Sequence, residues 1–128
     1  MNARPQPPFD SWPRQEFDPV FGYIWYAHPA VVATQTTITH ASVAMATFVH
    51  DVIDLVIEHT ARDIAKYGGL LFIHDFRSLA GLDTEARLEF LARVRRRTPG
   101  YTRGTLVAIR MDQPLLRMGV QGANLMLS

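Results

Sequence analysis

The stretch GGLLFIHDFRSLAGLDTEARLEFLARV, residues 68–94, contains the pattern that decides the predicted fold of this chain. It opens with a short apolar run, residues 70–74, which is typical of a strand buried on both faces of a sheet. A polar loop follows, and Asp83 then precedes an amphipathic segment that indicates a helix over residues 84–97. Such a loop lies at the carboxyl edge of the sheet, where functional residues of α/β proteins often gather.

The residues after this stretch predict a second strand of the same sheet. In the expected helix, Phe90, Leu91 and Val94 face inward, and the opposite face carries charged residues. These charged residues are Glu85, Glu89, Arg93 and Arg96. The Pro-Gly pair at 99–100 is expected to end the helix, and residues 105–110, TLVAIR, predict a buried strand. A strand, a helix and a strand in succession form a βαβ unit, so the two strands should be parallel.

Upstream of this unit, the sequence predicts a β-hairpin and then a long helix. Residues 21–26 and 31–36 are rich in aromatic and β-branched side chains, and His28-Pro29 lies between them where a turn is needed. Residues 39–67 predict one helix, with Thr39 as its N-cap and Gly68-Gly69 as its end.

Charged and apolar positions alternate along this long helix with helical spacing. Its polar face is expected to be a solvated stripe made of Asp51, Asp54, Glu58, Arg62 and Lys66. Within that stripe Glu58 and Arg62 have the spacing of an i,i+4 ion pair. The opposing apolar face contains Val49, Val52, Ile53, Val56, Ile57 and Ile64.

The two ends of the chain differ in character from its middle. Residues 1–19 hold five prolines and predict a disordered or loosely docked arm, whose Phe9 and Trp12 could anchor it on a partner. Residues 20–128 are predicted to form the domain, with a last helix beginning near Pro114. We expect either that this domain continues beyond Ser128 or that its final helix is short.

Composition limits the classes of protein to consider. The chain has 128 residues, 48% of them hydrophobic and 20% charged, which fits a single globular α/β domain. It has no cysteine, so disulfides and thiolate chemistry are excluded. It also lacks an apolar run of membrane-spanning length and a secretory signal, and we therefore expect a cytoplasmic protein.

The sequence offers no motif for catalysis or for a cofactor. The five histidines show no metal-ligand spacing, and His74 at the end of its strand is expected to bond to a backbone group. Neither a nucleophile elbow nor a glycine-rich phosphate loop is present. A set of Ser78, His74 and Asp75 can be drawn, but most chains of this size contain one. We expect a protein that is not an enzyme and has no metal and no cofactor.

The basic run RVRRR, residues 93–97, is the only segment that suggests nucleic acid or anionic lipid as a partner. No aromatic residue is interleaved with its arginines to stack on bases. Cations at a helix C-terminus interact favourably with the helix dipole and are commonly solvated there. We therefore expect no nucleic-acid partner.

The loop from Asp75 to Thr84 remains as the best candidate site. Asp83 and Thr84 begin a helix, whose free N–H groups favour a negative charge. One interpretation is a structural cap, in which Asp83 accepts hydrogen bonds from backbone N–H groups. The other is a phosphorylation site at Thr84, where the added charge would meet the positive end of the dipole.

The order of elements and this loop resemble the STAS domain family (sulfate transporter and anti-sigma factor antagonist), in particular its SpoIIAA-like branch. The matching part is LLFIHDFRSLAGLDTEARLEFL, beside the family's apolar strand, acidic turn and Asp-Ser-Ser-Gly helix start. By this resemblance Asp75 corresponds to the acidic turn, Asp83 to the family's aspartate and Thr84 to its phosphoacceptor serine. Glu85 and Ala86 stand where the family has Ser-Gly.

The resemblance implies a bacterial signalling module that acts through protein–protein contact. Its partner would be an anti-sigma-factor-type kinase, which phosphorylates the acceptor hydroxyl and so abolishes binding. The partner-binding residues would be Asp75, Arg77, Ser78, Asp83 and Glu85, with Thr84 as the phosphoacceptor. The aromatic arm and the apolar C-terminal residues also allow a homodimer.

The alternative is a module that binds a small molecule. A pocket between the long helix and the sheet would take a small apolar or anionic ligand. The aromatic residues Tyr23, Trp25 and Tyr26 of the hairpin would line it, although core packing is their simpler use.

Overall fold

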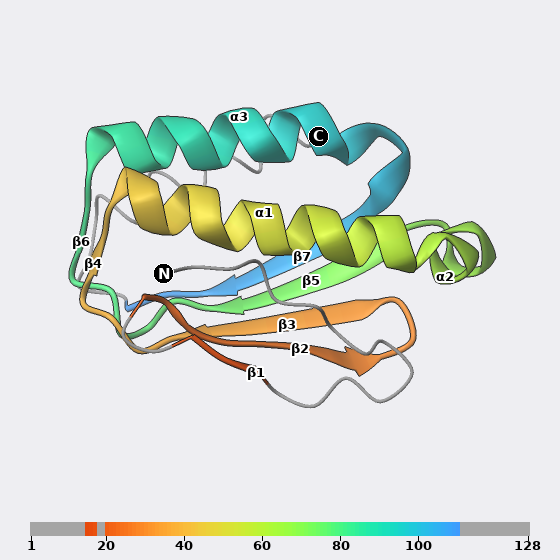
Figure 1. The fold of residues 1–128 in the computed structure, drawn as a ribbon, viewed down its shortest axis with the longest axis horizontal. Helices are drawn as coiled ribbons and strands as arrows, with labels where there is room; N and C mark the ends of the chain where they lie inside the picture. Colours follow the sequence, from red (N-terminus) through yellow and green to blue (C-terminus); the bar gives the residue numbers. More distant parts are fainter. Residues whose placement is uncertain (1–14, 18–19, 111–128) are drawn as a thin grey trace.

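The computed structural model describes residues 15–17 and 20–110, which form a mixed β-sheet with helices on one face (Figure 1). The strand order is β1-β2-β3-β5-β7, with antiparallel pairing from β1 to β3 and parallel pairing from β3 to β7. These strands are β1 (Gln15–Glu16), β2 (Gly22–His28), β3 (Val31–Thr36), β5 (Leu70–Asp75) and β7 (Thr102–Ala108). The predicted α/β fold with an N-terminal hairpin and a parallel βαβ unit is confirmed.

Strands β2 and β3 form the predicted hairpin. Their turn contains Ala30, a non-glycine residue with a φ of 64°, in the left-handed region. The Tyr26 hydroxyl accepts a hydrogen bond of 2.6 Å from the Ala30 N–H and donates one of 2.7 Å to Asp63. The Tyr26 side chain therefore stabilises the turn and also links it to the helix that carries Asp63.

The prediction of one long helix over residues 39–67 is wrong, because the helix starts later and is divided in two. The structure has α1 (Val43–His59) and α2 (Ala61–Tyr67). Ser42 is the N-cap of α1, because its Oγ accepts a hydrogen bond from the Met45 N–H. Thr39 instead lies in a bend ahead of the helix, where its carbonyl accepts hydrogen bonds from the N–H groups of Ala80 and Gly81.

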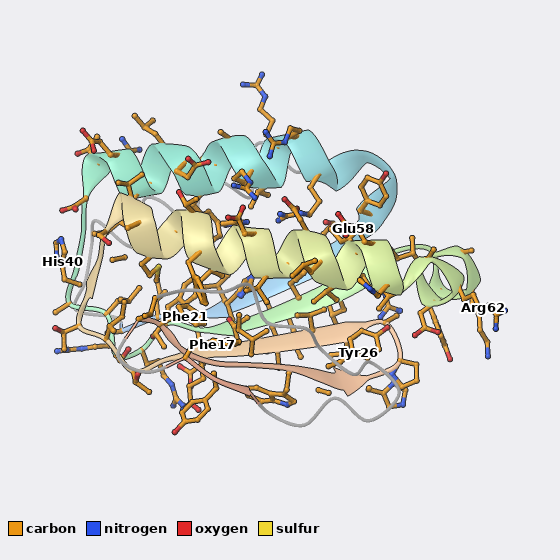
Figure 2. All side chains as sticks on the ribbon, viewed as in Figure 1. Phe17, Phe21, Tyr26, His40, Glu58 and Arg62 are labelled. Carbon is orange, nitrogen blue, oxygen red and sulfur yellow. The ribbon has the colours of Figure 1, made fainter. Side chains whose placement is uncertain are left out.

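Thr60 separates the two helices. Its hydroxyl donates a 2.7 Å hydrogen bond back to the Val56 carbonyl, and its ψ of 25° interrupts helical geometry. As a result Glu58 lies on α1 and Arg62 on α2, so the i,i+4 geometry expected for this pair does not hold (Figure 2). Gly68 caps α2 in the left-handed conformation, as predicted.

Helix α3 (Thr84–Tyr101) lies beside α1 over the same face of the sheet (Figure 1). It continues past Pro99 and Gly100, so the predicted helix end near Arg97 is wrong. Gly100, with a φ of 94°, provides the left-handed turn through which the chain enters β7. Strand β7 accordingly begins at Thr102, three residues before the predicted position.

Strand β5 is buried on one face and not on both, which corrects the expectation from its apolar sequence. Leu70, Phe72 and His74 are buried beneath the helices, whereas Ile73 on the opposite face is 39% exposed. The described helices cover only one side of the sheet, which explains the alternation.

The core lies between that helix-facing side and α1. Its buried apolar side chains include Phe21, Ile24, Val32, Val49, Val52, Ile53, Val56, Leu70 and Phe72. Of the predicted apolar face of the long helix, positions 49, 52, 53 and 56 are thus confirmed as buried. Phe17 packs against this core, with its ring 5.2 Å from that of Phe48. The rest of the predicted arm and the predicted last helix lie outside the described residues.

Candidate functional site

The loop after β5 begins with a bidentate ion pair. Arg77 donates from Nε and Nη2 to the two carboxylate oxygens of Asp75, both at 2.9 Å. The Arg77 backbone N–H adds a 3.2 Å bond to the same carboxylate. Because Arg77 donates to it, the pKa of Asp75 is held below its usual value. The pair places one carboxylate and one exposed guanidinium at the carboxyl edge of the sheet.

Ser78 has a structural role in this loop. Its Oγ donates a 2.7 Å hydrogen bond to the Ile38 carbonyl and lies 2.5 Å from Oγ1 of Thr36. Thr36 is the last residue of β3, and Ile38 lies in the segment that follows it. Ser78 therefore fastens the loop to the sheet, and its hydroxyl is already occupied.

A second short sheet orients the end of the loop. Strands β4 (His40–Ala41) and β6 (Gly81–Leu82) pair in parallel, and the Asp83 N–H donates to the Ala41 carbonyl at 3.0 Å. A Cβ at position 81 would lie 2.7 Å from Nδ1 of His40, so only glycine lets this ring approach the backbone. The start of α3 is thus built on two segments that are far apart in sequence.

Asp83, Thr84 and Glu85 lie together at the start of α3. The Asp83 carbonyl accepts the first helical hydrogen bond, from Arg87, as expected of an N-cap. Within the described residues, however, its carboxylate bonds to His40, with 2.6 Å between Oδ1 and Nε2, and the predicted side-chain cap is absent. Thr84 and Glu85 are exposed in the first turn. His40, which the sequence did not indicate, thereby joins the site (Figure 2).

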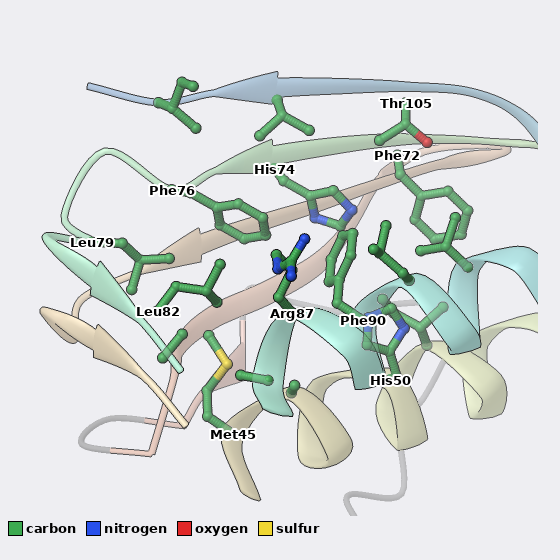
Figure 3. A pocket seen from close by; sticks show the side chains of 18 of the residues that line it. Met45, His50, Phe72, His74, Phe76, Leu79, Leu82, Arg87, Phe90 and Thr105 are labelled. Atoms are coloured by element: carbon green, nitrogen blue, oxygen red, sulfur yellow. The ribbon is translucent and has the colours of Figure 1, made fainter. Parts of the chain in front are cut away.

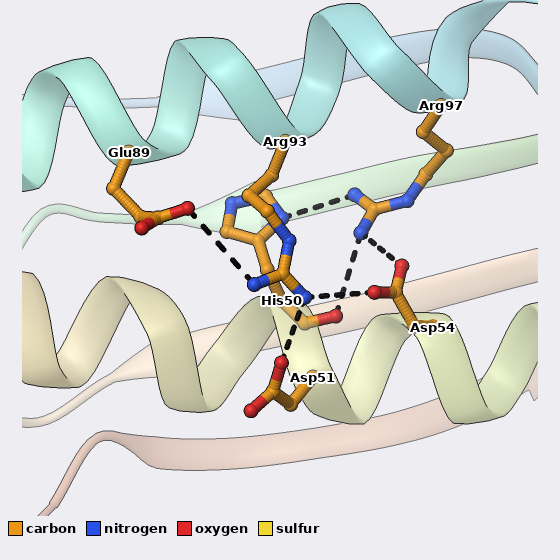
Figure 4. Close-up of polar contacts among 6 residues, drawn as sticks. All are labelled: His50, Asp51, Asp54, Glu89, Arg93 and Arg97. Atoms are coloured by element: carbon orange, nitrogen blue, oxygen red, sulfur yellow. Dashed lines mark hydrogen bonds and ion pairs between the residues drawn. The ribbon is translucent and has the colours of Figure 1, made fainter.

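A polar cluster joins α1 to α3 on another part of the molecule (Figure 4). Nη2 of Arg93 lies 2.7 Å from carboxylate oxygens of both Asp51 and Asp54. Nη2 of Arg97 lies 2.6 Å from the other oxygen of Asp54. Asp51 and Asp54 of the predicted solvated stripe keep 45% and 37% of their side-chain surface exposed, but they are also paired with α3. Arg93 is 9% exposed where an outward position was expected. Of the basic run, Arg95 and Arg96 remain exposed.

The cluster changes the acidity of its members. Burial would raise the pKa of Asp54, but hydrogen bonds from Arg97 and Arg93 lower it below its usual value. Burial lowers the pKa of Arg97, and the positive charge of Arg93 acts in the same direction. Burial, followed by the charge of Arg97, also lowers the pKa of His50 well below its usual value.

A cavity of about 90 Å³ lies between α1, α3 and the helix-facing side of the sheet (Figure 3). Its wall is mostly apolar and includes Met45, Phe72, Phe76 and Phe90, with His50 and His74 among them. The hairpin residues Tyr23, Trp25 and Tyr26 do not line it, contrary to the expectation for a pocket here. The sheet register shows the reason for two of them, since Tyr23 and Trp25 share the face opposite the helices.

His74 is buried in the wall of this cavity. Its Nδ1 lies 2.7 Å from Oγ1 of Thr34, so the expected partner, a backbone group, is replaced by a side chain on the neighbouring strand. Its ring stacks between Phe72 and Phe76, at 5.9 and 5.1 Å. Burial, with a smaller contribution from Arg97, lowers the pKa of His74 to about 4. The ring is therefore neutral at pH 7.

The described residues hold no group of three or more histidine and acidic side chains that could bind a metal ion. Ser78, His74 and Asp75 do not form a catalytic triad. The Ser78 hydroxyl donates to the Ile38 carbonyl, and the His74 ring lies on the helix-facing side of the sheet. None of the helices described here is long and apolar enough to cross a membrane.

Comparison with protein-family models, with curated proteins and with solved structures finds no match to this chain. The resemblance to STAS domains therefore stays a prediction. The fold and the geometry above define a mixed α/β domain with two separate features. One is the surface formed by the half-buried Asp75 and the exposed Arg77, Asp83, Thr84 and Glu85, called here the loop–helix surface. The other is the cavity between α1, α3 and the sheet.

Proposed function

We propose that this chain is a non-enzymatic regulatory module that binds a protein partner through the loop–helix surface. The observation that supports this most directly is the exposure of Thr84 in the first turn of an 18-residue helix. A hydroxyl in that position is open to a kinase. Its neighbours Asp83 and Glu85 are exposed as well and can contact the same partner.

The surface is also held in one shape before any partner arrives. Ser78 ties the loop to the segment after β3, the β4–β6 pair orients the start of α3, and Arg77 is fixed on Asp75. A surface that is already ordered loses less conformational entropy on binding. These contacts favour docking of a folded partner.

Phosphorylation of Thr84 would act as a switch on this surface. A phosphoryl group adds nearly two negative charges beside Asp83 and Glu85. Repulsion and desolvation at an interface would then release the partner. By the resemblance to STAS domains, we propose an anti-sigma-factor-type kinase as the partner and as the source of the phosphoryl group.

The test is binding of such a kinase from the same genome to the purified chain. We expect Asp75→Ala and Thr84→Glu to reduce binding at least tenfold, and Thr84→Ala to bind but resist phosphorylation. Ala65→Glu is the matched control, because it places the same carboxylate on exposed α2, at the opposite end of the molecule (Figure 1). If Asp75→Ala and Thr84→Glu both bind like the unchanged chain, the loop–helix surface is not the interface.

A further inference from the structure

The cavity between α1, α3 and the sheet has a buried inner wall and a more exposed outer wall. The inner wall comes from α1 and β5 and includes Phe72 and His74, which are both buried. The outer wall comes from α3 and β7 and includes Leu91 and Val107, which are only half-buried. The cavity therefore reaches the surface between α3 and β7, where a small molecule can enter.

The wall combines hydrocarbon surface with positive charge. None of the described residues that line the cavity is acidic, and its charged members are two arginines of α3, Arg87 and Arg97. Its two histidines, His50 and His74, are neutral at pH 7, because burial lowers the pKa of each. The wall therefore has no carboxylate that would oppose the binding of an anion.

The two arginines differ in whether their charge is already matched. Arg97 is 7% exposed, and its guanidinium donates to the carboxylate of Asp54 at 2.6 Å. Arg87 is exposed, and no ion pair joins it to the residues that the structure describes. The carboxylate of Asp83, one helical turn earlier, is bonded to Nε2 of His40 at 2.6 Å instead. Arg87 is therefore the guanidinium that a bound anion can pair with.

Arg87 brings its charge close to the apolar part of the cavity. Its neighbour Ala86 is fully buried in the wall, and Phe90 lies one turn later on the same helix. Figure 3 shows the Arg87 side chain among those of Phe76 and Phe90. An exposed guanidinium in this place can hold a carboxylate in contact with water while hydrocarbon enters the cavity. The negative charge is then not buried, which would be costly.

We propose that this cavity binds a small monocarboxylate, with the carboxylate paired to the guanidinium of Arg87 and the hydrocarbon chain in contact with Phe72 and Phe90. A guanidinium pairs with a carboxylate through two parallel N–H···O bonds. A phosphate group carries nearly two charges, and one unmatched guanidinium would leave part of that charge unpaired. The inference goes beyond the docking proposal and does not rest on it, because no residue of the loop–helix surface lines the cavity.

The volume of the cavity sets the expected length of the hydrocarbon chain. An apolar cavity of about 150 Å³ holds the six carbons of benzene, so in proportion the cavity of about 90 Å³ holds about four carbons. Pentanoate, with four carbons beyond its carboxylate, is therefore a suitable probe. Each methylene group that enters the cavity should raise the affinity about fourfold.

The first experiment titrates pentanoate, acetate and pentanamide into the full chain at pH 7 and follows binding by ¹H–¹⁵N NMR. Acetate has the charge without the chain, and pentanamide has nearly the same shape as pentanoate without the charge. We expect pentanoate to bind about tenfold or more tightly than acetate, and about fivefold more tightly than pentanamide. NOEs from the pentanoate methyl group to the rings of Phe72 and Phe90 should place the chain in the cavity. No pentanoate binding, the loss of either preference, or NOEs to other residues alone would overturn the proposal.

Two variants of α3 test the role of Arg87. Arg87→Gln removes the charge of an exposed side chain, so the affinity for pentanoate should fall about fivefold while that for pentanamide stays the same. Arg96→Gln is the matched control, because Arg96 is also exposed on α3 but does not line the cavity. Both probes should bind this control as they bind the unchanged chain. Full pentanoate affinity in Arg87→Gln, or an equal loss in the two variants, would overturn the assignment of the carboxylate to Arg87.

Discussion

Nη1 of Arg97 lies 3.0 Å from Nδ1 of His50, so a guanidinium of α3 contacts an imidazole of α1 in the interior of the domain. The same guanidinium bonds to Asp54, and Arg93 bonds to Asp51 and Asp54 one helical turn earlier (Figure 4). The two helices are therefore joined by charged groups as well as by apolar packing. Because a guanidinium can only donate, Nδ1 of His50 accepts from Arg97, and the proton of the neutral ring lies on Nε2.

Arg97→Ala should destabilise the domain by about 2–3 kcal/mol. The change leaves His50 Nδ1 without its donor and removes one partner of Asp54, and breaking a buried pair from one side is costly. The loss is smaller than for a fully buried pair because the Asp54 side chain is 37% exposed. Urea denaturation measures it. Arg96→Ala, on the same helix but exposed, should change stability by less than about 0.5 kcal/mol. Equal effects of the two variants would contradict a structural role for Arg97.

The stability of the domain should fall as the pH is lowered from about 6.5 to 4. The unfolded chain binds a proton at His74 with the usual pKa near 6.5, whereas in the folded chain burial lowers that pKa to about 4. Protons therefore favour the unfolded state throughout this window, and His74 alone accounts for a loss of about 2 kcal/mol between pH 7 and pH 5. His50 acts in the same direction.

His74→Gln tests this pH dependence, because glutamine can still bond to Thr34 but does not titrate. Urea denaturation at pH 7 and pH 5 should show a smaller loss in this variant. His28→Gln, in an exposed position, should show the same loss as the unchanged chain. An undiminished loss in His74→Gln would mean that other groups cause the acid sensitivity.

Two adjacent glycines should respond very differently to alanine. A Cβ on Gly69 would lie 2.8 Å from the Arg103 nitrogen and 3.0 Å from the Thr102 carbonyl carbon, at a φ of 122°. Gly69→Ala should therefore cost about 3 kcal/mol or more, through backbone strain and a clash with β7. Gly68 has a φ of 76°, and a Cβ added there would meet no atom within 4 Å, so Gly68→Ala should cost only about 1 kcal/mol. Thermal denaturation compares them, and similar losses would contradict the close approach of β7 to Gly69.

Tyr26→Phe should lower stability by about 1–2 kcal/mol. The hydroxyl bonds to the N–H of Ala30 and to Asp63, and the phenylalanine leaves both without this partner. Burial, together with the hydrogen bond to Asp63, raises the pKa of Tyr26, so the hydroxyl stays protonated as a donor. Tyr101→Phe is the control, because Tyr101 is 45% exposed. Denaturation of the two variants in parallel measures the difference, and no loss in Tyr26→Phe would show that the hydroxyl does not stabilise the turn.

The places where the sequence misled share one physical origin. Arg93 has the helical spacing of an exposed position, and only the packing of α3 against α1 brings Asp51 and Asp54 within its reach. Thr39 has a suitable side chain for a helix N-cap, but its backbone is occupied by Ala80 and Gly81 from a distant loop. Local patterns contain propensity and spacing. They do not contain the partner that a neighbouring element supplies.

The sequence by itself determined the order of the main strands and helices, the hairpin, the parallel β5–α3–β7 unit and the place of Thr84 at the start of a helix. These features depend on alternation, helical spacing and turn residues, which act over a few positions. Only the tertiary structure decided that His40 meets Asp83, that Ser78 is already bonded, and that Arg97 contacts His50 in the interior. Each of these joins residues about 40 or more positions apart, and no local pattern records such a contact.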